Sequence, residues 1–297
     1  MKLVLFGDDF RLGILQNDTV IDVSSIGNEV PHSTPQETMK RVIENFERYR
    51  SALDGLANSS EGIPVNAVRL RAPLPNPSRL VCMAVNYMED ERQTVPPPIN
   101  AFNKSSSSVI GNGDTVILPD VDATIFEHEA ELGIVIGKRA SSIDPNEAYD
   151  YIFGYVNFID VSCRGAGPAG RDSFFIGKSW DTFGPMGPAL VTIDEVSNPL
   201  DLNVRLYVEG ELRQDYSTSG MAHKIPAMLG WVTSITTLEP GDVVTCGTNH
   251  LGLGPLQDRD TVEMEIDNFG KLTVYVEDQK KRSWPRETRA QREAREA

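Results

Sequence analysis

Residues 126–137 read FEHEAELGIVIG, in which acidic residues alternate ahead of an apolar run. In a β-strand, residues two apart share a face. Glu127, Glu129 and Glu131 would then point to one side of the strand and the apolar residues to the other. Unpaired carboxylates packed together repel and raise each other's pKa. The pattern therefore predicts a strand whose acidic face holds a cation.

A further acidic residue, Asp160, ends a second strand-like run over residues 151–159. A neighbouring strand of this kind would bring a third carboxylate to the first two. Three carboxylates without a cysteine or histidine cluster suit a hard, oxygen-preferring ion. We therefore expect Glu129, Glu131 and Asp160 to bind Mg²⁺, or Mn²⁺ or Ca²⁺ in its place.

The rest of the chain predicts many strands and few helices. Expected strands cover residues 81–84, 116–118, 132–136, 152–158, 189–193, 204–208, 243–246, 262–266 and 272–276, and one helix covers 225–235. Turn signals such as Asn268-Phe269-Gly270 separate the strands. This arrangement indicates a mainly β or α+β protein with a β-roll or barrel-like core, because a doubly wound sheet would alternate strands with helices.

The first part of the chain predicts a small α+β unit. Its strands are followed by a helix that begins at Thr34 and Pro35, with Glu37 at the third position of a capping box. Residues 58–64, rich in Ser, Gly and Pro, are the expected linker. We therefore predict a small N-terminal domain at 1–62, a metal-binding catalytic domain at 75–280 and a charged tail at 281–297.

Composition restricts the class of protein. The chain has 297 residues, 40% of them hydrophobic, and a formal net charge of −15. This charge argues against nucleic acid and anionic membranes as partners. The apolar stretches are too short to cross a bilayer, and the N-terminal residues do not resemble a signal peptide. The three cysteines are odd in number and far apart, which favours a reducing cytoplasm.

Several motifs, taken together and in order, resemble those of the fumarylacetoacetate hydrolase family. The resemblance covers roughly residues 78–278. Its motifs are Asn86-Tyr87; Phe102-Asn103-Lys104-Ser105; Glu129-Ala130-Glu131-Leu132; Asp160-Val161-Ser162-Cys163-Arg164; Gly177-Lys178-Ser179-Trp180-Asp181; Glu209-Gly210-Glu211 with Gln214; and Gly247-Thr248. Each motif alone is weak, but their shared order is specific.

The resemblance implies a β-roll catalytic core that usually dimerises, so a homodimer is expected. It implies that Glu129, Glu131 and Asp160 hold the metal, which would chelate a small oxo-acid substrate and stabilise its enolate. It also implies a catalytic role for Lys178. The expected substrate-binding residues are Arg164, Thr248, Lys104 and Tyr87. Two alternatives remain: an ion pair with a neighbouring acid for Arg164, and a purely structural role for Lys104.

One position departs from the family pattern. In hydrolytic relatives, the Asn-Tyr pair is usually followed by two residues and then a histidine, whereas this chain has Asp90 at the histidine position. Asp90, or its acidic neighbours Glu89 and Glu91, would replace the missing base, because a carboxylate accepts a proton from water. His250 is the other candidate base. A third possibility is that the reaction uses no protein base of this kind.

The resulting prediction is a cytoplasmic, Mg²⁺- or Mn²⁺-dependent hydrolase that cleaves a carbon–carbon bond of an acylpyruvate-like acid. Because the usual histidine is absent, an isomerase, a decarboxylase or a dehydratase acting on a 2-keto or 2-keto-3-deoxy acid is the main alternative. A non-catalytic protein that binds metal and ligand is an alternative of another class.

Overall fold

The computed structural model describes residues 1–29, 32–89, 94–168 and 173–296. Within these residues, the main sheet has 12 strands. They are, in spatial order, β4 (Ile63–Pro64), β3 (Thr19–Asp22), β2 (Arg11–Gln16), β1 (Lys2–Phe6), β14 (Gly184–Thr192), β12 (Ile152–Ile159), β11 (Ala130–Ile136), β17 (Val243–Thr245), β6 (Leu80–Met83) and β7 (Ala101–Asn103), with β5 (Leu70–Arg71) beside β1 and β8 (Val109–Ile110) beside β14.

Two smaller sheets complete the β structure. The larger has the order β16 (Glu211–Ser217), β15 (Asn203–Val208), β18 (Thr261–Ile266), β19 (Gly270–Glu277) and β9 (Thr115–Ile117). The other joins β10 (Ile125–Glu127) to β13 (Ser162–Arg164) in antiparallel register. The pairing of β10 with β13 lies directly beside the ends of β11 and β12, so it shapes the region where the predicted acidic residues lie.

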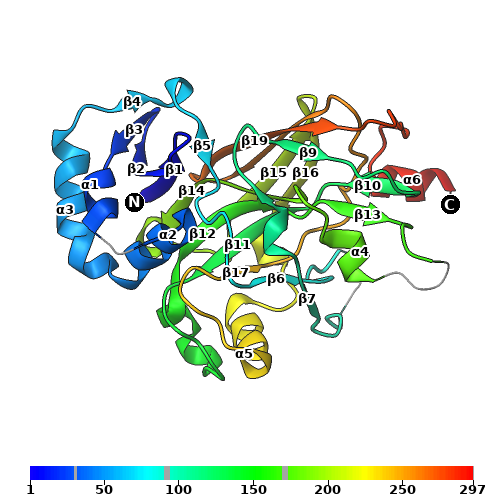
Figure 1. Ribbon diagram of the computed structural model, residues 1–297. Helices are drawn as coiled ribbons and strands as arrows, with labels where there is room; N and C mark the ends of the chain where they lie inside the picture. Colours follow the sequence, from blue (N-terminus) through cyan, green and yellow to red (C-terminus); the bar gives the residue numbers. More distant parts are fainter. Residues whose placement is uncertain (30–31, 90–93, 169–172, 297) are drawn as a thin grey trace.

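Helices lie around these sheets rather than between successive strands (Figure 1). They are α1 (Ser24–Glu29), α2 (Pro35–Glu44), α3 (Phe46–Ser59), α4 (Phe174–Lys178), α5 (Ile225–Ile235) and α6 (Arg289–Glu296). Helices α1 to α3 pack at one end of the molecule with the first strands, and α6 lies at the opposite end. Helix α2 begins where expected, because the Thr34 side chain accepts a hydrogen bond from the Glu37 amide.

Strands β11 and β12 form the buried centre of the main sheet. Every residue of both strands is buried, and they pair antiparallel, with Ala130 opposite Ile159. Leu132 and Ile134 belong to one apolar cluster, whereas Val135 belongs to the cluster on the other face. Burial on both faces explains the continuous apolar run in this part of the sequence. It also holds the ends of the two strands in a fixed relation.

The mainly β, α+β fold class is confirmed, but the acidic segment before β11 differs from the prediction. Residues 126–136 do not form one continuous strand: β10 ends at Glu127, β11 begins at Ala130, and His128 and Glu129 lie between them. The interruption arises because the chain changes partners here, from β13 to β12. Glu127 is thereby separated from the other two glutamates and does not join their cluster.

The N-terminal strands continue the main sheet. Strand β1 pairs antiparallel with β14, with Leu3 opposite Leu190. At the other end of the chain, residues 289–296 form α6, and the Trp284 indole donates a hydrogen bond to the Thr124 carbonyl. The boundaries at 1–62, 75–280 and 281–297 stay a prediction.

Candidate active site

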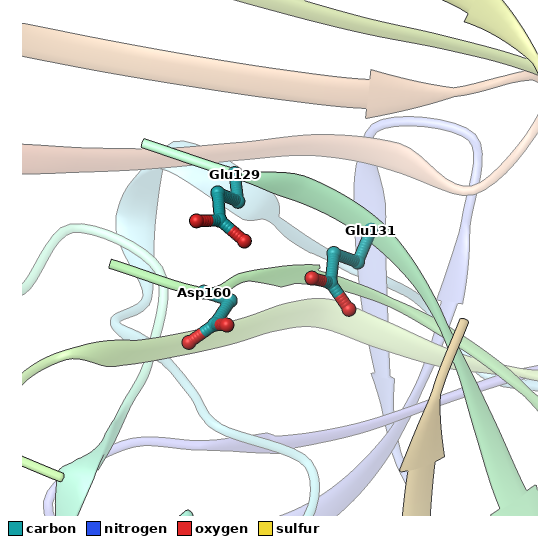
Figure 2. Close-up of side chains that lie close together, drawn as sticks. All are labelled: Glu129, Glu131 and Asp160. Atoms are coloured by element: carbon teal, nitrogen blue, oxygen red, sulfur yellow. The ribbon is translucent and has the colours of Figure 1, made fainter. Parts of the chain in front are cut away.

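Three buried carboxylates converge where β11 and β12 meet (Figure 2). Glu131 lies in β11, Glu129 just before it, and Asp160 just after β12. The Asp160 amide donates to the Glu129 carbonyl at 2.8 Å, which fixes the two strand ends against each other. Each residue offers one ligand oxygen, and these oxygens all lie within 4.8 Å of one another. The structure therefore brings together the three residues predicted to bind metal.

The charges of the three carboxylates are not balanced equally. Burial acts to raise the pKa of Glu129, but the nearby Lys178 and Arg164 cations hold it below its ordinary value. Burial, followed by the charges of Asp160 and Glu129, raises the pKa of Glu131 well above its ordinary value. One oxygen of Glu131 accepts from the Gly247 amide at 3.0 Å. The cluster therefore contains one carboxylate whose negative charge is poorly stabilised.

Two buried lysines contact the cluster. Lys178 Nζ lies 2.8 Å from Glu129 Oε1 and 2.6 Å from Asp160 Oδ2. Burial acts to lower the pKa of Lys178, but the adjacent Asp160 and Glu129 raise it, so this lysine is charged. Lys104 Nζ lies 2.6 Å from Asp160 Oδ1 and also donates to the Val161 carbonyl at 3.2 Å. Lys104 is thus a fully buried partner of Asp160.

Arg164 bridges two acidic residues beside the cluster. Its Nε donates to Glu127 Oε2 at 2.9 Å, and its Nη2 contacts Glu129 Oε1. The ion-pair alternative for Arg164 is therefore present in the structure. The side chain is 38% exposed, so the guanidinium also faces a cavity of about 290 Å³ that Lys178 and Phe174 help to line. Arg164 is placed both to hold Glu129 and to contact an anionic ligand.

The donor set fits a hard divalent cation. All three side chains are carboxylates, as Mg²⁺ and Mn²⁺ prefer. Glu131 Oε1 is buried and has no hydrogen-bond partner among the described residues. A buried oxygen without a donor is costly unless a cation or another donor reaches it. Glu129, Glu131 and Asp160 are therefore the residues that could hold the metal.

A larger cavity, of about 440 Å³, lies between α3 and β12. Its walls include half-exposed surface groups that already pair with each other, such as Arg50 and Asp194. The smaller cavity beside Lys178 is the better candidate for chemistry, because Lys178 and Arg164 line it and both contact Glu129 of the buried cluster.

Gln214 links the predicted residue Thr248 to the strand that carries the cluster. Its Nε2 donates to Thr248 Oγ1 at 2.7 Å, and its Oε1 accepts from the Ala130 amide at 3.0 Å. The same oxygen lies 3.1 Å from Nδ1 of His128, a fully buried residue whose pKa is lowered by burial to about 4. His128 is therefore neutral near pH 7 and supports Gln214.

Tyr87 packs beside the same group. Its ring makes an edge contact with Tyr216 at 4.9 Å, and its buried hydroxyl has no hydrogen-bond partner among the described residues. Tyr216 in turn donates to the Ala130 carbonyl and lies 3.4 Å from Thr248 Oγ1. Tyr87 and Thr248 therefore both contact the Tyr216 side chain, and their role in substrate binding stays a prediction.

His250 and Glu89 form a pair near the cluster. Glu89 Oε1 contacts His250 Nδ1 and also accepts from the His250 amide at 2.8 Å. Burial acts to raise the pKa of Glu89, but the hydrogen bond and charge of His250 hold it below its ordinary value. His250 follows Thr248 and Asn249, which Gln214 links to the strand that carries the cluster. Asp90 and Glu91 lie outside the described residues.

Two residues of the site had no role in the sequence analysis. Ser162 donates to Glu129 Oε1 at 2.8 Å, and Tyr216 contacts Ala130 and Thr248 as described above. Tyr216 carries a period-2 signal, because it lies two residues after Gln214 in β16 and so shares a strand face with it. Ser162 begins β13 directly after the break that holds Asp160, and no strand period marks it.

Comparison with known proteins agrees with this fold and site. Residues 79–277 match the family described as fumarylacetoacetate (FAA) hydrolase, C-terminal, a family of enzymes. The chain belongs to the fumarylacetoacetate hydrolase family. It is 32% identical over 279 residues to the mitochondrial oxaloacetate tautomerase of Xenopus laevis, covering 90% of this chain and 86% of the relative.

Two further relatives are similar over nearly their whole length. The chain is 31% identical to the maleylpyruvate hydrolase of Aquipseudomonas alcaligenes, covering 93% of this chain and 99% of that protein. The crystal structure of maleylpyruvate hydrolase from Sphingobium sp. SYK-6, in complex with manganese(II) ion and pyruvate, is 33% identical. It matches with a TM-score of 0.84 and covers 94% of this chain and 99% of its own.

In the described part of the chain, no helix combines the length and apolar character needed to cross a membrane.

Proposed function

We propose that this protein is a divalent-metal-dependent hydrolase that cleaves a carbon–carbon bond of an acylpyruvate-like acid. The observation that carries the proposal is the buried cluster of Glu129, Glu131 and Asp160, with Glu131 Oε1 lacking a partner among the described residues. Similarity to maleylpyruvate hydrolases over nearly the whole chain supports this reaction. The manganese and pyruvate bound by one of them support both the metal and the type of product.

A divalent ion held by Glu129, Glu131 and Asp160 would polarise the 2-oxo group and offset the negative charge that develops on its oxygen. Two cationic side chains of the protein, Lys178 and Arg164, would help to stabilise this negative charge and to orient the substrate. Lys178 is held within 2.8 Å of Glu129 and 2.6 Å of Asp160, so it is fixed in position before the substrate arrives. Arg164 presents a partly exposed guanidinium to the cavity, where it would orient a carboxylate.

The pair formed by Glu89 and His250 supplies the proton transfers in this proposal. Glu89 contacts Nδ1 of His250 and fixes the ring, so Nε2 is the nitrogen that exchanges a proton. Nε2 accepts a proton from water as the water oxygen attacks the acyl carbonyl carbon. The bond between that carbon and the neighbouring methylene then breaks, and its electron pair forms the pyruvate enolate. The enolate carbon takes back one proton, so the products are a carboxylic acid and pyruvate.

Keto–enol tautomerisation is the second candidate function. The relative from Xenopus laevis is named an oxaloacetate tautomerase, and a proton-exchanging pair beside a carboxylate cluster suffices for that reaction without cleavage of any bond between carbons. We also propose that the protein forms a homodimer, as the family resemblance implies.

The test uses the purified protein with acylpyruvates, with oxaloacetate and with 2-keto-3-deoxy acids, each with and without EDTA. We expect an acylpyruvate to give pyruvate and a second acid, with one ¹⁸O atom from labelled water in that acid, and EDTA to abolish the reaction until Mn²⁺ or Mg²⁺ is restored. Release of carbon dioxide, loss of water, or enol decay without cleavage would overturn hydrolysis in favour of decarboxylation, dehydration or tautomerisation respectively. Inactivity on all of these, together with no metal-dependent binding of oxalate, would favour a non-catalytic protein.

A further inference from the structure

The chain beyond the last strand packs against the start of β10 and against the loop between β17 and β18. Trp284 joins two separate segments there: its indole N–H donates to the Thr124 carbonyl at 2.6 Å, and its own carbonyl accepts from Gln257 Nε2 at 2.9 Å. Its ring also makes an edge contact with Phe126, with centroids 6.0 Å apart. Trp284 therefore ties the start of β10 to the loop that follows β17.

Helix α6 begins just after these contacts, with a reciprocal cap. The Thr288 amide donates to Gln291 Oε1 at 2.8 Å, and the Gln291 amide donates to Thr288 Oγ1 at 3.3 Å. Thr288 is thus the N-cap, and Arg289 and Ala290 are the first two helical residues. The amides of these first positions have no partner inside a helix, so they are available to bind another segment.

Both amides donate to the loop that carries His250. The Arg289 amide donates to the Leu253 carbonyl at 2.7 Å, and the Ala290 amide donates to the Leu251 carbonyl at 3.0 Å. The Leu253 amide in turn donates to the His250 carbonyl at 3.1 Å. Two consecutive helical amides therefore hold the turn that begins at His250.

The other end of this loop is held from inside the protein. Gln214 Nε2 donates to the Asn249 carbonyl at 2.9 Å. The His250 backbone is thus fixed on one side by Gln214 and on the other by α6.

We propose that residues 282–292, the C-terminal strap, position the His250 loop for turnover. Arg289 and Ala290 are then positioning residues that act through the loop backbone and do not touch the substrate. The catalytic consequence rests on the proposed function, whereas the structural effect on the loop does not. The strap also assigns a role to the basic tail, whose composition alone indicates only a solvated arm or a short helix.

The test is a pair of variants at one position, Arg289→Pro and Arg289→Ala. Both remove the side chain, including its ion pair with Glu293, but only proline removes the amide that donates to Leu253. Proline is well tolerated at the first helical position, and the preceding N-cap residue is ordinarily extended, as a residue before proline prefers to be. The comparison therefore isolates one backbone hydrogen bond and leaves α6 intact.

We expect Arg289→Pro to raise the hydrogen-exchange rate of the amides of residues 250–254 about fivefold relative to Arg289→Ala, which is the factor expected for the loss of one ordinary hydrogen bond. We also expect kcat to fall about threefold or more while KM for the acylpyruvate and the melting temperature stay as in Arg289→Ala. A general loss of folding would lower the melting temperature and increase exchange across the whole sheet.

The proposal for the strap would be overturned if the amides of residues 250–254 exchanged hydrogen equally fast in the two variants. It would also be overturned if these amides exchanged faster in Arg289→Pro while kcat stayed unchanged. Trp284→Phe, which removes the indole donor to Thr124, gives a second variant should the proline variant fail to fold. Its matched control is Trp231→Phe in α5. If the wild-type protein hydrolyses none of the substrates, the proposed function fails, but the exchange measurement still decides whether the strap holds the loop.

Discussion

The substitution Glu131→Gln should have opposite effects on stability with and without metal. In the metal-free protein, Glu131 is buried beside Glu129 and Asp160 with ligand oxygens no more than 4.8 Å apart. At this separation, two like charges repel by about 3 kcal/mol for an effective dielectric constant of roughly 20. Lys178 and Lys104 offset the charges of Glu129 and Asp160, but Glu131 Oε1 has no partner among the described residues.

In the folded metal-free protein, Glu131 avoids this repulsion by keeping a proton that the unfolded chain loses at neutral pH, which costs stability. Glutamine has no such cost, so Glu131→Gln should stabilise the metal-free protein at neutral pH by about 1–3 kcal/mol, somewhat less than the full repulsion. A melting temperature higher by a few degrees is expected, at about 2–4 °C per kcal/mol. With metal, wild-type protein gains about 4.1 kcal/mol at a metal concentration of roughly 1,000 times the Kd, which exceeds the advantage of the variant. The variant lacks one ligand and should gain much less, so the order of stability reverses.

The pH dependence has a defined sign. Burial and the charges of Asp160 and Glu129 raise the pKa of Glu131. The folded metal-free protein then keeps a proton that the unfolded chain loses above the ordinary glutamate pKa, so stability falls as the pH rises above that value. Glu131→Gln should remove this contribution to the decrease in stability with rising pH.

The assay is thermal unfolding at several pH values, in EDTA and in saturating Mn²⁺. Glu277→Gln, at an exposed position of β19, is the matched control and should change stability by less than about 0.5 kcal/mol. The reasoning would be refuted if Glu131→Gln destabilised the metal-free protein, or if Mn²⁺ raised the melting temperature of the variant as much as that of the wild type.

Three further outcomes are expected. Lys178→Met should destabilise the metal-free protein by about 3–5 kcal/mol in urea unfolding, because it leaves Glu129 and Asp160 with one buried cation fewer; an unchanged midpoint would contradict the buried pairing. His250→Gln should lower kcat by a factor of about 10²–10⁴ with little change in the affinity for metal and oxalate, since general-base catalysis is worth that much, whereas the exposed control His32→Gln should keep full activity. Glu89→Gln should lower kcat less than His250→Gln, because it perturbs the orientation of the ring and leaves the ring itself; equal or greater loss would assign the proton transfer to Glu89.

The sequence predicted the centre of the fold well, because burial leaves a local signal. The apolar runs around Leu132 and Val156 mark two strands buried on both faces, and they lie in β11 and β12 as expected. The convergence of Glu129, Glu131 and Asp160 was predictable for the same reason, since each lies at a fixed offset from a strand end. Their binding of metal stays a prediction.

Contacts between distant segments could not be predicted from the sequence. The break between Glu127 and Ala130 depends on which strand lies alongside, and β10 and β11 take different partners. Lys104 reaches Asp160 across 56 positions of the chain, and no local pattern marks a lysine as buried. Strand β16 was absent from the prediction because its edge position leaves Leu212 exposed among polar residues, so apolar alternation is weak there.

The continuity of the main sheet bears on any attempt to excise the catalytic part of this protein. Strand β1 supplies the partner for the outer end of β14, around Leu190 and Val191. A shortened chain that begins after residue 62 would leave these backbone groups unpaired, as an open edge made of apolar residues. Such an edge recruits other chains, so a fragment chosen by the family match alone would be prone to aggregate even though its own carboxylate cluster is complete.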